Sequence, residues 1–336
     1  MRRLSVGLDW QGDLDRATVF EQVQAADRGG VHSVWVAEAW GRDAFTMLTQ
    51  LAERTSAIQL ATGIVNVFSR SPGALAQHFA TLDELSGGRA IIGLGASGPQ
   101  VIEHFHGVPF ERPLARIRES IAVINTLMSG EPLVHRGEVF RLERGFTLRF
   151  SPVRPHIPVF IASMGARSVR QTAEIADGWL PIWTPLPHLA EAVGRFRQAA
   201  AQAGRDPAAL LVRSAGTTVV TTDPARALKA ARRALSFYVG RMGTFYREHL
   251  ERLGYGEVTA AILRGYGEGG SGGALAATPE DLSQAMGLVT DSVDAARARM
   301  DAEAAAGIDI HQVRVEGYPP AEMARIYAAL ASTASS

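Results

Sequence analysis

The sequence contains no cysteine among its 336 residues. Disulfide bonds, cysteine nucleophiles and thiolate metal ligands are therefore excluded. The nine histidines are scattered, and none belongs to the His-Glu-x-x-His pattern of many zinc enzymes. We therefore expect no metal site.

The chain also lacks an excess of charge of either sign, because 34 basic side chains balance 34 acidic ones. No basic surface patch that would bind nucleic acid or an acidic membrane is expected. No segment approaches the ~18 consecutive apolar residues of a membrane span, and the N-terminus lacks the apolar core of a signal peptide. We expect a cytoplasmic protein that binds neither nucleic acid nor membrane.

What the sequence does contain is an alternation of short apolar runs and amphipathic segments. Strands are expected at residues 4–8, 33–37, 58–65, 90–94, 159–162, 178–181, 210–220 and 312–315. Helices are expected at 15–28, 45–54, 72–85, 114–128, 168–176, 189–203, 224–239 and 321–331. Repeated strand–helix units predict an α/β fold with a parallel sheet, and eight units predict a single TIM-like (β/α)8 barrel over residues 1–336.

Three insertions interrupt this alternation, at about 99–113, 130–157 and 240–280. The second is typical of a small hairpin over 133–142 that turns at Arg136-Gly137-Glu138. The third contains a glycine-rich run, residues 265–273, whose composition is too flexible to hold itself rigid. This run is expected to be either a flexible connector or a lid over the barrel mouth.

Residues 90–98 lie at the centre of the pattern. An apolar run that ends at Leu94 predicts a buried strand, and Gly95, Ala96, Ser97 and Gly98 follow with almost no side chains. Such a loop lets backbone N–H groups approach a ligand, often a phosphate, although a tight turn without a ligand is the alternative. Residues 93–98 also match the dinucleotide fingerprint. We reject that interpretation because the fingerprint should open the first strand–helix unit, whereas here it closes the fourth strand.

In a (β/α)8 barrel the site lies at the C-terminal ends of the strands. These ends are residues 9–10, 38–40, 63–66, 95–98, 163–165, 181–184 and the positions after Val220 and Val315. They are apolar, aromatic or small, with Glu38 as one candidate base and no evident Ser-His-Asp arrangement. A mouth of this kind suits a flat aromatic cofactor that brings its own chemistry.

Seven stretches, residues 34–44, 61–64, 69–72, 80–89, 92–101, 113–116 and 176–185, carry a family resemblance. In them the chain resembles the luciferase-like monooxygenase superfamily, in its branch dependent on the deazaflavin coenzyme F420. The segments at 97–100 (Ser-Gly-Pro-Gln) and 177–181 (Asp-Gly-Trp-Leu-Pro) resemble that branch more than the flavin mononucleotide (FMN) branch. The resemblance implies a barrel that is usually dimeric and an enzyme that transfers a hydride between the coenzyme and a small organic substrate.

The resemblance also implies a catalytic pair. Glu38 matches an acidic position near the coenzyme ring and would move a proton where the substrate requires one. Trp40 would stack on the ring. The alternatives are that Glu38 is a surface carboxylate or a partner of a helix N-terminus, and that Trp40 packs under its loop.

The cofactor site implied by the resemblance is formed by several strand ends. Gly63 and Ile64 match a bulge that often carries a non-proline cis peptide bond, which would press Ile64 onto one face of the ring. The helix after Gly165 would offer free N–H groups to an anion, or it is a plain helix start with a Ser cap. The full implied set is Gly63, Ile64, Val65, Gly95, Ala96, Ser97, Gly98, Ala162, Ser163, Met164, Gly165 and Trp183.

One position departs from the family pattern. Sugar-phosphate dehydrogenases of this branch place a histidine just after the position of Glu38, where this chain has Ala39. The departure argues against a sugar-phosphate substrate, and His104 and His106 either substitute or lie on a surface loop. Two other functions stay open: an FMN-dependent monooxygenase fed by a separate reductase, and a non-catalytic flavin-binding protein.

Overall fold

The computed structural model describes residues 1–8 and 15–333, and the predicted strand end at residues 9–10 lies outside them. Eleven strands form the central sheet, and every pairing described in it is parallel. They are β1 (Arg3–Leu8), β2 (Ser33–Val36), β3 (Gln59–Thr62), β4 (Val65–Asn66), β5 (Ala90–Gly95), β8 (Val159–Ala162), β9 (Gly178–Leu180), β10 (Leu211–Val212), β11 (Thr218–Thr221), β12 (Val289–Thr290) and β13 (Ile310–Glu316).

The sheet closes into the predicted barrel. Its hydrogen-bonded order is β10-β9-β8-β5-β3-β2-β1-β13-β11-β12, with β4 beside β5. Arg213, directly after β10, forms a parallel bridge with Ile310 of β13, and the N–H of Ser214 donates to the carbonyl of Ile310 at 2.8 Å. This seam joins β10 to β13, so that β1, β2, β3, β5, β8, β9, β10 and β13 make a ring of eight strands.

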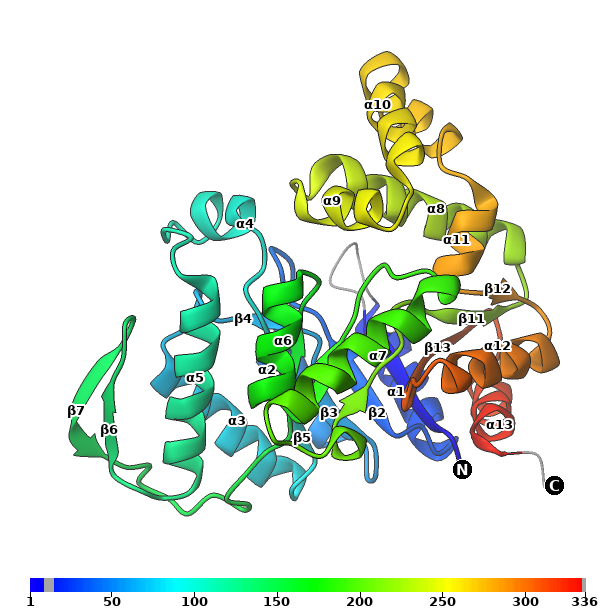
Figure 1. The fold of residues 1–336 in the computed structure, drawn as a ribbon. Helices are drawn as coiled ribbons and strands as arrows, with labels where there is room; N and C mark the ends of the chain where they lie inside the picture. The colour runs from blue at the N-terminus through cyan, green and yellow to red at the C-terminus, as the bar shows by residue number, and fades with distance from the viewer. Residues whose placement is uncertain (9–14, 334–336) are drawn as a thin grey trace.

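Helices surround the barrel (Figure 1). Asp43 and Ser71 each cap a helix by accepting a hydrogen bond from a backbone N–H of its first turn. The surrounding helices are α1 (Arg16–Arg28), α2 (Ala44–Ala52), α3 (Pro72–Ser86), α5 (Pro113–Met128), α6 (Ala166–Ile175), α7 (Leu186–Gln202), α12 (Val293–Ala305) and α13 (Pro320–Ala331), with a short 3₁₀ helix η1 (Pro207–Ala209) after α7. The apolar faces of α1, α2, α3, α5, α12 and α13 and the outward side chains of the strands form the main core, and α7 packs in a separate cluster. No helix in the described ranges is long and apolar enough to cross a membrane.

The seventh predicted strand, 210–220, is wrong as a single element. β10 ends at Val212, the chain leaves the barrel after the seam contacts of Arg213 and Ser214, and strand pairing resumes at Thr218. Gly216 explains the break, because a Cβ there would lie 1.9 Å from the carbonyl oxygen of Met286. The segment between β10 and β11 therefore contacts the backbone of the helix that ends at Met286. A continuous strand over 210–220 could not follow this path. Three further elements between residues 280 and 305 were not predicted: α11 (Glu280–Met286), β12 and α12.

The third insertion forms α9 (Phe245–Arg252) and α10 (Gly256–Ala276) above the barrel mouth, where they make one helical group with the predicted helix before them, α8 (Pro224–Arg241), and with α11 after them (Figure 1). The expectation that the glycine-rich run is too flexible to hold itself is wrong, because the run lies within α10. The helix breaks at Gly269–Gly270, where Gly270 has φ 58°. A Cβ at Gly265 would lie 2.5 Å from the carbonyl oxygen of Gly273. The missing side chains therefore allow the two halves of α10 to pack against each other.

The other two insertions hold a short helix and a hairpin. α4 (Pro99–His104) follows β5. The predicted hairpin is confirmed as β6 (Leu133–Arg136) and β7 (Arg141–Phe146), and its second strand runs beyond the predicted end at 142. Glu119 of α5 accepts hydrogen bonds from the backbone N–H groups of Glu138, Val139 and Phe140, which ties the hairpin turn to the barrel.

Candidate active site

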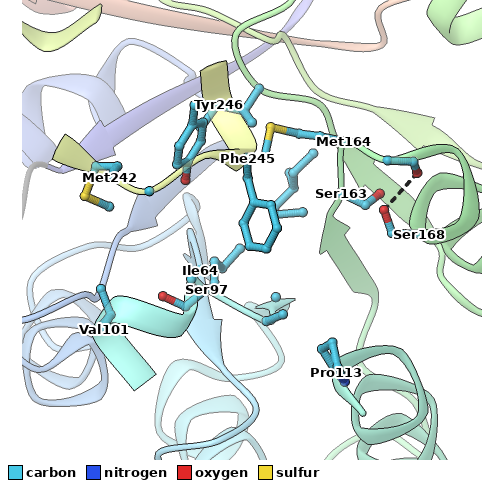
Figure 2. A pocket seen from close by; sticks show the side chains of 18 of the residues that line it. Ile64, Ser97, Val101, Pro113, Ser163, Met164, Ser168, Met242, Phe245 and Tyr246 are labelled. Carbon is cyan, nitrogen blue, oxygen red and sulfur yellow. Dashed lines mark hydrogen bonds between the residues drawn. The ribbon is translucent and has the colours of Figure 1, made fainter. Parts of the chain in front are cut away.

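A cavity of about 1000 Å³ lies at the C-terminal ends of the barrel strands. Its walls come from the ends of β2, β3, β5, β8 and β9 and from α4, α5 and α6, and the α8–α9 segment covers it. Figure 2 shows Phe245 in the middle of the cavity, between Met164 and the corner that holds Ile64 and Ser97. The volume is at the upper end of the range for small-molecule and cofactor sites.

The predicted site residues meet in this cavity, with two exceptions. Val65 is fully buried in the main core, because it pairs with Leu94 in β5 and its side chain faces the helices. Trp183 packs under α8, with its ring 5.1 Å from that of Tyr238. We therefore remove Val65 and Trp183 from the set. Every other predicted catalytic or cofactor residue lines the cavity.

Ile64 forms one wall of the cavity. The Gly63–Ile64 peptide bond is cis, as the resemblance implied. A Cβ at Gly95 would lie 2.8 Å from Cδ1 of Ile64, and a Cβ at Gly63 would lie 3.0 Å from Cβ of Trp35. Because both positions are glycine, the bulge can pass Trp35 and the Ile64 side chain can lie across the end of β5. The contact of Ile64 with a ring stays a prediction.

The loop after β5 presents backbone to the cavity. Ser97 is left-handed, with φ 61°. Gly98 is the N-cap of α4 and makes no side-chain cap, and a Cβ there would meet nothing within 4 Å. The edge of the cavity is therefore open at this loop.

A second exposed helix start lies across from this loop. Gly165 is the N-cap of α6, and no side chain caps that helix. The Ser163 hydroxyl instead shares a hydrogen bond with Thr172 at 2.9 Å, and the Ser168 hydroxyl donates to the carbonyl of Gly165 at 2.9 Å (Figure 2). The alternative of a Ser cap is therefore not what the structure shows. The first-turn N–H groups of α6 are not capped by a side chain, and this end of the helix lines the cavity.

Glu38 is bound on both oxygens. Arg70 donates from Nη1 to Oε1 at 2.5 Å and from Nη2 to Oε2 at 3.0 Å, and the N–H of Ala44 donates to Oε2 at 2.9 Å. Asp43 pairs with the same guanidinium at 2.5 Å. Burial opposes the charge of Arg70, but the bonds and charges of Glu38 and Asp43 outweigh it and raise the Arg70 pKa. Glu38 is thus a partner of the α2 N-terminus, which was one of its two predicted alternatives.

The two histidines after β5 have different surroundings. His104, on α4, lines the cavity. His106 lies with Nε2 3.4 Å from Nδ2 of Asn66. Burial lowers the pKa of His106, with Glu38 opposing and Arg70 reinforcing that effect. Of the two candidates to replace the missing histidine, His104 is therefore the one that faces the cavity.

Several cavity residues were not predicted. Arg213 and Gln312 line it from the β10–β13 seam, and Phe245 and Tyr246 line it from α9. Arg213 was missed because the strand was expected to continue to Val220, which put its end in the wrong place. A single arginine in the apolar run 210–213, followed by Ser-Ala-Gly, was the available signal for an early strand end.

A model of the luciferase-like monooxygenase family matches residues 6–309. The chain belongs to this family. A Mycobacterium tuberculosis protein with the provisional name of coenzyme F420-dependent oxidoreductase is 32% identical, over 98% of each chain. A 5,10-methylenetetrahydromethanopterin reductase of Methanolobus tindarius is 30% identical, over 80% of this chain and 78% of that one.

Solved structures share the fold. The coenzyme F420-dependent tetrahydromethanopterin reductase from Methanopyrus kandleri superposes with a TM-score of 0.82 at 24% identity, over 97% of each chain. The likeness extends through the insertions, since it covers nearly all of both chains. The luciferase-like barrel predicted from the sequence is therefore the fold of this family member.

Proposed function

We propose that this protein is a coenzyme F420-dependent oxidoreductase, which transfers a hydride between the deazaflavin and a small organic substrate. The observation that carries the proposal is the cavity: a large, mainly apolar mouth walled by Ile64 and by a loop almost without side chains. The relative at 32% identity over 98% of both chains supports the choice of coenzyme. The FMN-dependent monooxygenase and the non-catalytic binding protein are the alternatives that the experiment below separates.

The residues present fit this coenzyme. Ile64, backed by Gly95, offers a broad apolar contact for one face of a flat ring. The backbone at Ser97 and Gly98 and the uncapped first turn of α6 offer N–H groups to a phosphate-bearing tail. Arg167, in that first turn, lines the cavity and adds a positive charge. When bound, the deazaflavin supplies hydride transfer, and the chain's contribution is to hold one ring face and leave the other open to substrate.

We assign Glu38 to positioning. Its carboxylate accepts three hydrogen bonds from Arg70 and Ala44, which hold the end of β2 against the start of α2. Trp40 lies between these two elements and lines the cavity. This arrangement supports a role for Glu38 in holding Trp40 toward the ring. His104 is then the side chain available for proton transfer.

The test is a pair of titrations followed by fluorescence quenching, one with coenzyme F420 and one with FMN. We expect tighter binding of coenzyme F420. Equal or tighter FMN binding would favour the monooxygenase alternative. Tight F420 binding without any hydride transfer to a panel of carbonyl, imine and alkene acceptors would favour the binding protein.

We also infer a homodimer. The hairpin and the segment after it expose large apolar side chains, with Val134 62%, Phe146 71% and Val153 52% exposed. Exposed apolar groups gathered on one protruding element are typical of an interface. Light scattering should give about twice the chain mass of 36.0 kDa, and a mass of one chain at micromolar concentration would contradict this.

A further inference from the structure

Arg213 is a fixed guanidinium whose charge is not compensated by any carboxylate in the described part of the chain. Its Nε donates to the Ser5 hydroxyl at 2.9 Å, and that hydroxyl donates to the carbonyl of His311 at 3.3 Å. The guanidinium carbon lies 4.8 Å from the ring centroid of Trp35, in cation–π contact. Nη2 is buried without a hydrogen-bond partner, and no carboxylate of residues 1–8 or 15–333 forms an ion pair with Arg213.

Leaving a cation in this position is unfavourable, because a buried charge without a partner is costly. Burial lowers the pKa of Arg213 to about 9, because removing the charged guanidinium from water is unfavourable. The packing around it is apolar, with Trp35, Phe160 and Ile310 in one interior cluster. A charge that is held by Ser5 and Trp35, belongs to a residue that lines the cavity and has no carboxylate partner among the described residues is typical of a ligand site.

Gln312 shares this corner of the cavity. A Cβ at Gly7 would lie 3.2 Å from Nε2 of Gln312 and 4.0 Å from Nη2 of Arg213. The two polar groups therefore lie above the same glycine of β1, and both residues line the cavity. A guanidinium and a side-chain amide placed together can donate several hydrogen bonds to one pair of oxygens.

The position of this corner points to the substrate rather than the coenzyme. In the ring of eight strands, β10 is opposite β3, and β13 is opposite β5. Ile64 follows β3 and the loop 95–98 lies at the end of β5, whereas Arg213 directly follows β10 and Gln312 belongs to β13. A ring held against Ile64 would have Arg213 and Gln312 across the barrel mouth from that wall.

We propose that Arg213, together with the side-chain amide of Gln312, binds a carboxylate of the substrate. The substrate class is then a small organic acid, held with its carboxylate against the β10–β13 seam and the rest of the molecule toward the open face of the ring. The orientation relative to the ring rests on the proposed function. The anion site itself does not, because it is built from this chain's own residues.

The test uses isobutyrate and its uncharged isostere isobutyramide, titrated into the protein by calorimetry without coenzyme at constant ionic strength. We expect isobutyrate to bind about tenfold or more tightly than isobutyramide, and Arg213→Met to reduce isobutyrate affinity by about tenfold or more. Arg241→Met is the matched control, because Arg241 also lines the cavity but lies on α8. It should leave isobutyrate binding unchanged. Arg213→Met should also keep or raise the melting temperature, since it removes an unpaired charge.

Three results would overturn the proposal: equal affinity for acid and amide, unchanged isobutyrate binding in Arg213→Met, or displacement of isobutyrate by coenzyme F420. The last would mean that the guanidinium faces the coenzyme. If Arg213→Met does not fold, Arg213→Lys is used in its place. In that variant the ratio of isobutyrate affinity to isobutyramide affinity should be smaller than in the parent protein. Failure to bind coenzyme F420 would refute the proposed function while leaving the isobutyrate result to stand by itself.

Discussion

Ser97 offers the sharpest test of the coenzyme tail at the level of a single residue. It has φ 61° at the edge of the cavity, a conformation that Asp and Asn both tolerate. Ser97→Asp should weaken coenzyme F420 binding about tenfold or more, because a carboxylate would face the phosphate of the tail. Ser97→Asn, of the same size without the charge, should bind within about threefold of the parent. Fluorescence quenching measures both, and equal losses in the two variants would place the phosphate elsewhere.

Glu38 is the predicted catalytic residue for which we propose a positioning role instead. Glu38→Gln should lower the free energy of unfolding by about 2 kcal/mol, because Arg70 loses a partner in a pair with little exposure to solvent. The shape of the pH profile of turnover should stay the same, since the carboxylate is held by Arg70 and does not exchange protons with substrate. Urea unfolding and a pH–rate series measure the two effects.

Arg70→Met provides the control for this prediction. It removes the other partner of the same pair, so the double variant should lose less stability than the sum of the single losses. A loss of one limb of the pH profile in Glu38→Gln, with unchanged stability, would instead restore its predicted role in proton transfer.

At the level of elements, α10 shows how a glycine-rich run can be a packed helix. Gly265→Ala should destabilise the helical group, because its Cβ would lie 2.5 Å from the carbonyl oxygen of Gly273. Gly267→Ala is the matched control within the same helix, since a Cβ there meets nothing within 4 Å. It should stabilise by roughly 0.5–1 kcal/mol through helix propensity. Hydrogen exchange over 256–276 measures both, and similar exchange in the two variants would show that the halves of α10 do not pack together in solution.

At the level of the whole molecule, we expect closure of the barrel to depend on a buried carboxylate, that of Glu303. Glu303 of α12 is 2% exposed, accepts from Ser214 Oγ at 2.7 Å and from Arg299 Nε at 3.0 Å, and lies 3.0 Å from Nδ1 of His311. Ser214 and His311 lie on the two sides of the β10–β13 seam. The carboxylate therefore links α12 to the place where the ring of strands closes.

Glu303→Leu should cost about 3–5 kcal/mol of unfolding free energy, because it leaves Arg299 buried without its partner. Chemical denaturation measures this loss. Glu316→Gln removes an exposed partner of Arg314 and should cost less than about 1 kcal/mol. Equal effects of the two substitutions would show that the seam does not depend on Glu303.

Local patterns predicted most of the barrel. Short apolar runs bounded by turn residues marked the strands, because each strand is buried on both faces and needs no distant partner to be recognised. The prediction from apolar runs was wrong where a contact with a distant part of the sequence determines the course of the backbone. Gly216 passes the backbone of Met286, and this breaks a strand that its composition alone favours.

The same division holds at the site. The sequence by itself determined the barrel, the side-chain-poor loop at 95–98 and, through family resemblance, the cis bond at Gly63–Ile64. All three depend on residues close together in the chain. Only the tertiary structure decided that Arg70 binds the carboxylate of Glu38 and that Arg213, opposite Ile64, has no carboxylate partner among the described residues. The physical reason is that the charge state and orientation of a side chain depend on what burial brings beside it, and those neighbours come from distant parts of the sequence.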